Sequence, residues 1–195
     1  TINHPTWFSK LSEAHVLEML DYHEAVLGIE IYNDYEGRRD WFSDPAYQRP
    51  AEPEVGFALA LWDRILATGR RCWGLAVPDH SVERLTDWHG RVVLLVPAVT
   101  DYDCLRAYRL GCFYSCLKDN GLTLTGLSLT ADAVTLSTNT PATATFITEA
   151  GVIAWTTGTR ATCPIPAGTI YLRVELSDDT GERLFLQPIS FPAGR

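Results

Sequence analysis

The hydrophobic pattern of this 195-residue chain changes character near Asn120-Gly121. Before that dipeptide, apolar runs of strand length alternate with segments of helical periodicity, whereas after it only short alternating runs remain. Strands that are apolar on both faces and alternate with helices are typical of a parallel sheet or barrel covered by helices. Short alternating runs are typical of an antiparallel sandwich. We therefore predict an α/β domain over residues 1–118, followed by a small antiparallel β-sandwich-like domain over residues 119–195.

The individual elements follow from the same periodicities. In the first part we predict helices over 10–21, 55–68 and 101–110, and strands over 25–32, 72–77, 91–98 and 112–115. Thr100 with Asp103 resembles a capping box for the third helix, and Gly111 can end it. In the second part we predict strands over 122–130, 133–138, 144–148, 152–155, 169–176 and 184–191.

The composition narrows the class of protein. Hydrophobic residues make up 46% of the chain, which is enough for a sizeable core. The net charge of −8 argues against a nucleic-acid partner, because binding a polyphosphate requires clustered lysine and arginine. The five cysteines lack the paired spacing of a zinc site, and we interpret them as small buried hydrophobic residues in a reducing, cytoplasmic compartment. The sequence shows neither a membrane-spanning segment nor a signal peptide.

The first residues of the chain are typical of the end of a strand rather than of its start. The chain begins with Thr1 rather than methionine, and its first five residues carry this pattern. We therefore expect the chain to be part of a longer protein.

The strand predicted over 72–77 ends in a carboxylate and an imidazole, Asp79 and His80. Oxygen and nitrogen donors of this kind bind divalent metals, and buried strands of α/β proteins present ligands at their carboxyl ends. The alternative is a loop aspartate that caps the next turn beside a solvated histidine. The pair alone does not decide between these interpretations.

Several segments, taken in order, resemble the C-terminal half of PHP-domain proteins (the polymerase and histidinol phosphatase family). These segments are Asn3-His4-Pro5, 28–33, 62–69, Asp79-His80-Ser81 and 111–115. The resemblance is to the subset of the family that carries an extra β domain, because 169–175, Gly181 and 187–189 resemble the closing domain of that subset. It covers nearly the whole chain.

The resemblance implies a fold and an activity. It implies part of a distorted β/α barrel, or an open parallel sheet derived from it, whose strand ends bind zinc, manganese or iron and hydrolyse a small phosphorylated substrate. By the same resemblance His4 and His80 are metal ligands, and Asp79 belongs to the last ligand motif. Glu30 and Asn33 match a segment beside the site, where Glu30 either binds the metal or holds neighbouring groups.

Two departures from the family pattern bear on activity. The last ligand motif of the family reads Asp-x-His, and here Pro78 stands where its first aspartate is expected. Either Asp79 takes over through a local shift, or the site has lost a ligand. The opening histidine motifs of the family lie upstream of His4, so we expect the site to be incomplete and the chain alone to be nearly inactive.

Other functions and an oligomer remain open at this point. A degenerate, non-catalytic relative could use its β domain to bind protein or carbohydrate, with Trp155 and Tyr171 stacking on sugar if they are exposed. A partial barrel would also leave sheet edges open, which a homo-oligomer or the β domain could cover. No membrane partner is expected.

Overall fold

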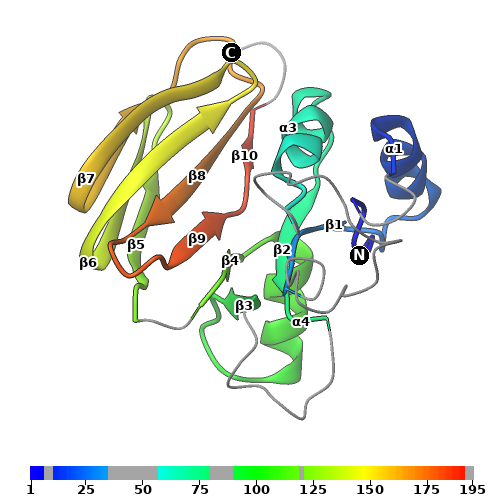
Figure 1. Cartoon of the computed structure of the whole chain (residues 1–195), viewed down its shortest axis with the longest axis horizontal. Helices are drawn as coiled ribbons and strands as arrows, with labels where there is room; N and C mark the ends of the chain where they lie inside the picture. The colour runs from blue at the N-terminus through cyan, green and yellow to red at the C-terminus, as the bar shows by residue number, and fades with distance from the viewer. Residues whose placement is uncertain (7–10, 35–56, 80–89, 119–120, 192–195) are drawn as a thin grey trace, which may run out of the picture.

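The computed structural model describes residues 1–6, 11–34, 57–79, 90–118 and 121–191 (Figure 1). Its helices over this part of the chain are α1 (Glu13–Tyr22), α3 (Leu59–Ala67) and α4 (Asp101–Leu110). Its strands are β1 (Gly28–Asn33), β2 (Trp73–Val77), β3 (Arg91–Leu94), β4 (Phe113–Cys116), β5 (Leu124–Leu129), β6 (Ala133–Thr148), β7 (Gly151–Pro164), β8 (Tyr171–Ser177), β9 (Arg183–Leu186) and β10 (Ile189–Ser190). None of the described helices is long and apolar enough to span a bilayer.

Strands β1 and β2 form a two-stranded parallel sheet near the N-terminus. Gly28 pairs with Trp73 at one end of the ladder and Asn33 with Val77 at the other. Ile2 adds a parallel bridge to Ile29 on the free side of β1. Three chain segments therefore run in the same direction side by side, and their carboxyl ends meet at one edge.

The predicted α/β barrel or open parallel sheet is wrong, because most strands belong to an antiparallel sheet. That sheet has the order β3-β4-β9-β8-β6-β5, with β7 paired to β6 and β10 to β8. Strands β3 and β4 join it as an antiparallel pair, and β4 pairs antiparallel with β9. All four residues of β4 are buried, as its apolar sequence predicts. Parallel strands are buried on both faces, and so are antiparallel strands that other elements cover. The apolar pattern therefore predicted the burial of these strands correctly, but not the direction of their neighbours.

The two longest strands, β6 and β7, build the β-rich region seen at the left of Figure 1. Their ladder is interrupted between Ser137 and Ala142, around Pro141, so the 16 residues predicted as two strands with a gap form one irregular strand. Side chains from both halves, such as Val134 and Phe146, share one buried cluster with β8 and β9. This arrangement is consistent with the predicted β-sandwich.

Arg173 of β8 connects the antiparallel sheet to helix α3. Its Nε and Nη2 atoms donate to the two carboxylate oxygens of Asp63 over 2.6 and 2.8 Å, and its Nη1 atom donates to Glu175 over 2.6 Å. The guanidinium lies 5.1 Å from the ring centroid of Trp62, and the side chain is only 3% exposed. Burial and the negative charge of Asp63 raise the pKa of the neighbouring Tyr171, whose hydroxyl donates to Asp63. The junction is thus held by an ion pair with a buried guanidinium, which donates three hydrogen bonds to two carboxylates.

Side chains, rather than a further strand, cover the outer edge of β2. The side-chain amide of Gln187 accepts from the Gly74 N–H and donates to the Gly74 carbonyl, both over 2.8 Å. The Ser115 hydroxyl accepts from the Ala76 N–H over 3.0 Å and donates to Gly74 over 2.9 Å. The backbone groups of this edge are therefore satisfied without a neighbouring strand.

The five cysteines are all free thiols, but they do not share one environment. Cys72, Cys116 and Cys163 are buried, as predicted, whereas Cys104 is half-buried and Cys112 is exposed. The interpretation as small core residues is confirmed for the first three and is wrong for Cys112, which follows the glycine that ends α4.

Alkylation is expected to separate these thiols. Burial raises the pKa of Cys72 to about 12, so its thiol is both shielded and protonated at neutral pH. Because the thiolate is the reactive form, iodoacetamide at pH 8 should modify Cys112 in the folded protein and Cys72 only after denaturation. Peptide mapping with and without denaturant measures this. Equal modification of Cys72 and Cys112 in the folded protein would contradict the assigned burial.

Candidate functional site

The carboxyl ends of three parallel segments bring together most of the predicted site residues. His4 follows the Ile2 bridge, Asn33 ends β1, and Asp79 lies two residues beyond β2. The edge exists because strand β1 ends at Asn33, strand β2 ends two residues before Asp79, and the bridge at Ile2 places His4 beside them.

A chain of hydrogen bonds connects these residues through Glu30. One carboxylate oxygen of Glu30, Oε2, accepts from the backbone N–H of His4 over 2.6 Å and from the Asn33 side-chain amide over 3.0 Å. The same amide nitrogen of Asn33 also donates to Oδ2 of Asp79 over 3.0 Å. We refer to His4, Glu30, Asn33 and Asp79 as the strand-end cluster.

Burial differs along this chain of bonds. Glu30 and Asn33 are 6% and 1% exposed, so they form the inner part of the strand-end cluster. His4 is half-buried and Asp79 is exposed, so these two residues form its outer part. Buried groups that hold exposed donors are arranged like outer-shell groups that orient ligands. Glu30 thus holds neighbouring groups, which was one of its two predicted roles.

The backbone is strained at the two outer residues. Among the described non-glycine residues, His4 (φ 30°) and Asp79 (φ 63°) are the two with positive φ. Such conformations cost about 1–3 kcal/mol and persist where surrounding contacts hold them, often at functional sites. Here the bonds to Glu30 and Asn33 are the contacts that hold them.

The described residues do not by themselves complete a metal site. His80, the remaining predicted ligand, lies outside the described residues, as does His89. Within the described ranges, no group of three or more His, Cys, Asp or Glu side chains is placed to hold a metal ion. Asp79 and His4 supply suitable donor types, but these two side chains alone are too few to hold a metal ion.

One polar residue beside the strand-end cluster, Asp34, was not predicted from the sequence. Asp34 directly follows β1 and is 2% exposed, and its Oδ1 atom accepts from the hydroxyl of Tyr32 over 2.7 Å. The signal was available, since a run of polar residues at the end of a buried strand is where such groups collect. A further buried carboxylate therefore lies at this edge.

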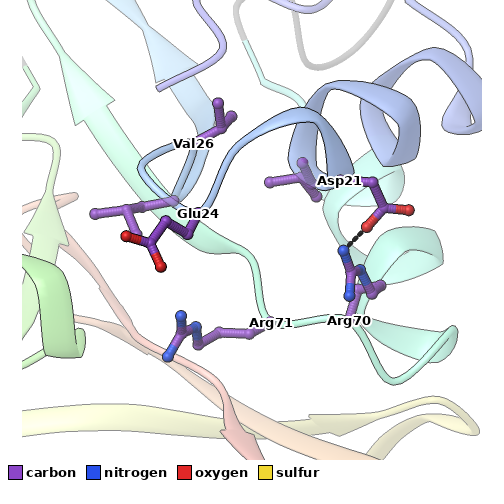
Figure 2. A pocket seen from close by; sticks show the side chains of 7 residues that line it. Asp21, Glu24, Val26, Arg70 and Arg71 are labelled. Carbon is purple, nitrogen blue, oxygen red and sulfur yellow. Dashed lines mark ion pairs between the residues drawn. The ribbon is translucent and has the colours of Figure 1, made fainter.

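A separate hollow lies at the opposite, amino-terminal ends of β1 and β2 (Figure 2). Arg70 forms an ion pair with Asp21 on one side of it, and the side chains of Glu24 and Arg71 lie on the other side in Figure 2. Because the strands are parallel, this hollow is at the far edge from Asn33 and Asp79. It is therefore no part of the strand-end cluster.

Comparisons with known proteins add no relative. No protein-family model matches the chain, and neither the curated proteins nor the solved structures provide a match. The resemblance to PHP-domain proteins therefore stands on the ordered motifs alone, and the activity that it implies is a proposal.

Proposed function

We propose that the strand-end cluster contributes to the site of a metal-dependent phosphoesterase, within a longer protein. The observation that carries this proposal is the pair of hydrogen bonds from Asn33, which connect Asp79 to the carboxylate that holds His4. Two candidate ligands from segments far apart in sequence are thereby fixed at one edge. The expected substrate is a small phosphorylated molecule, because the net charge of −8 disfavours a nucleic acid.

The residues divide into candidate ligands and residues that position them. His4, Asp79 and His80 are the candidate ligands, and a bound zinc, manganese or iron ion would neutralise phosphoryl oxygens and activate water. Glu30 holds the backbone at His4, and Asn33 orients the carboxylate of Asp79 by its hydrogen bond. Further ligands come from residues beyond the described part of the chain.

Pro78 supports the competing proposal of a non-catalytic relative, because proline has no donor side chain. The hydrogen bond from Asn33 supports the first proposal, since it holds the carboxylate of Asp79 at the site edge. We also propose that the protein works in a reducing, cytoplasmic compartment, with which the five free thiols agree. A homo-oligomer is a further part of the proposal.

Replacing Asp79 by asparagine in the longer protein is expected to lower the rate of p-nitrophenyl phosphate hydrolysis about 100-fold or more. The change keeps the shape of the side chain and removes the negative charge that would bind the cation.

Replacing Asn33 by leucine is expected to weaken metal binding about 10- to 100-fold, since the orienting hydrogen bonds are lost. Turnover and metal content, measured by mass spectrometry of the elements, report both effects.

The matched control is Asp132→Asn, which changes an exposed carboxylate in the turn before β6 and should leave turnover unchanged. A longer protein that holds no metal and hydrolyses no phosphomonoester would refute the phosphoesterase proposal. Full turnover by the 195-residue chain alone would instead refute the prediction that its site is incomplete.

A further inference from the structure

The most exposed tryptophan of the described sheet lies on a face that also carries several polar side chains. Trp155 of β7 is 71% exposed. Its cross-strand partner is Thr145 of β6, and Glu175 of β8 lies opposite Thr145. Directly opposed residues point to the same face, so this row consists of an indole, a hydroxyl and a carboxylate.

A second row of the same face carries hydroxyl groups. Thr157 lies two residues from Trp155, and its strand partner Thr143 lies opposite Ser177 of β8. The hydroxyls of Thr143 and Thr157 are 2.9 Å apart and hydrogen-bonded. Because each hydroxyl offers one donor and two acceptor positions, the bonded pair keeps one O–H donor and further lone pairs for a ligand.

This second row opens into a shallow pocket with a volume of about 540 Å³. The turn after β8 forms its other wall, where Oδ1 of Asp178 accepts from the backbone N–H groups of Thr180 and Glu182, both over 3.0 Å. These bonds fix the turn that presents the exposed Asp179 at the pocket. The pocket thus combines threonine and serine hydroxyls with carboxylates.

We infer that this face binds a neutral polysaccharide, with Trp155 stacking on a sugar ring and the hydroxyl row and Asp179 receiving its hydroxyl groups. A sugar has an apolar ring face and a periphery of hydroxyls, which is the combination that an exposed indole beside Thr143 and Thr157 complements. The exposed carboxylate of Asp179, together with the net charge of −8, disfavours an anionic polymer. This site is independent of the strand-end cluster.

The surroundings of Trp155 argue for sugar over a second copy of the chain as the occupant. The core of a protein–protein interface is apolar and depleted in charge. Here Thr145 and Thr157 flank the indole on its face and Glu175 lies in the next strand, while Val152, opposite Ile147, adds one exposed apolar side chain in the adjoining row. Tyr171, the other aromatic considered for this role, is 1% exposed and takes no part.

Affinity electrophoresis tests the inference, with native gels containing hydroxyethyl cellulose, xylan, galactomannan or dextran as probes. We expect at least one of these polymers to retard the protein. Trp155→Ala should weaken the apparent affinity about tenfold or more, because the buried apolar area is lost. Thr157→Val should weaken it about threefold, because one hydrogen-bonding group is lost from the bonded pair. Leu105→Ala, which changes an exposed apolar residue of α4 and not of the sheet, should bind like the unchanged protein.

Three outcomes of these experiments would overturn the inference. Retardation by none of the four polymers would do so, and so would equal retardation of the Trp155→Ala variant. If Trp155→Ala instead shifts the sedimentation coefficient of a self-associating protein, the face is an interface between copies. Circular dichroism of each variant confirms that the fold is retained.

Discussion

Replacing Arg173 by methionine is expected to lower the free energy of unfolding by about 3 kcal/mol. The substitution keeps most of the volume of the side chain and removes its charge. Asp63 and Glu175 then lose the cation that pairs with both of them, while the junction with α3 still excludes water from the space around residue 173. Urea denaturation followed by circular dichroism measures the change.

The expected loss of about 3 kcal/mol for Arg173→Met is at the lower end of the range of stability losses that follow when one partner of a buried ion pair is removed. The side chain of Asp63 is 32% exposed, so water partly solvates it once the guanidinium is gone. Burial by itself would lower the pKa of Arg173, yet the hydrogen bonds and charges of Asp63 and Glu175 raise it, so the guanidinium is charged at any ordinary pH. Arg160→Met, at an exposed position of β7, is the matched control and should change stability by less than about 0.5 kcal/mol. Equal effects of the two variants would show that the ion pair contributes nothing.

Replacing Trp62 by alanine is expected to cost about 4 kcal/mol of the free energy of unfolding. The indole is completely buried, and its Nε1–H donates to the carbonyl of Cys72 over 2.9 Å. It also packs so closely against Gly74 that a Cβ atom there would lie 2.7 Å from the ring. The variant therefore leaves a cavity behind β2 and an unpaired carbonyl. Urea denaturation again gives the measurement.

Trp155→Ala is the matched control for Trp62→Ala, since the same chemical change at a 71% exposed position should cost less than about 0.5 kcal/mol. Because Arg173 stacks on Trp62, the double variant Trp62→Ala/Arg173→Met should lose less stability than the sum of the two single variants. Strict additivity would contradict the stacking contact as a source of stability.

The helices were predictable because their signals are local. Thr100 caps α4 by accepting from the Asp103 N–H over 3.1 Å, and Gly111 ends this helix in the left-handed conformation, as the sequence predicts. Ser12 caps α1 by accepting from the His15 N–H at the start of the helix. Each of these contacts spans three residues or fewer, so a short window of sequence contains the necessary information.

Strand direction was not predictable in the same way. The apolar residues of β4 are equally compatible with a parallel neighbour and with the antiparallel pairing to β9 that the structure has. That choice depends on residues such as Leu184 and Leu186, far along the chain. The continuation of β6 past Pro141 was also not predictable from local sequence, because it depends on the pairing of both halves of the strand with β7.

Four residues of the candidate site were predictable from the sequence, but the hydrogen bonds between them were not. The order of motifs singled out His4, Glu30, Asn33 and Asp79, and the structure brings all four together. Which oxygen of Glu30 accepts which N–H, and that Asn33 connects to Asp79, depends on the β1–β2 register and on the strained turn at Asp79. A single sequence contains no direct record of either.

The side-chain cover over β2 has a consequence for the order of events during synthesis. Gly74 and Gln187 are separated by 113 positions, so the ribosome has exposed β2 long before the amide that completes its outer edge exists. Until then, the N–H group of Gly74 has water or the wrong partner as its alternative, whereas the Gly74 carbonyl can already accept from the Ser115 hydroxyl. Gln187 thus closes an edge that formed much earlier in synthesis, and the nascent protein passes through an interval in which a chaperone or a neighbouring chain can reach that edge.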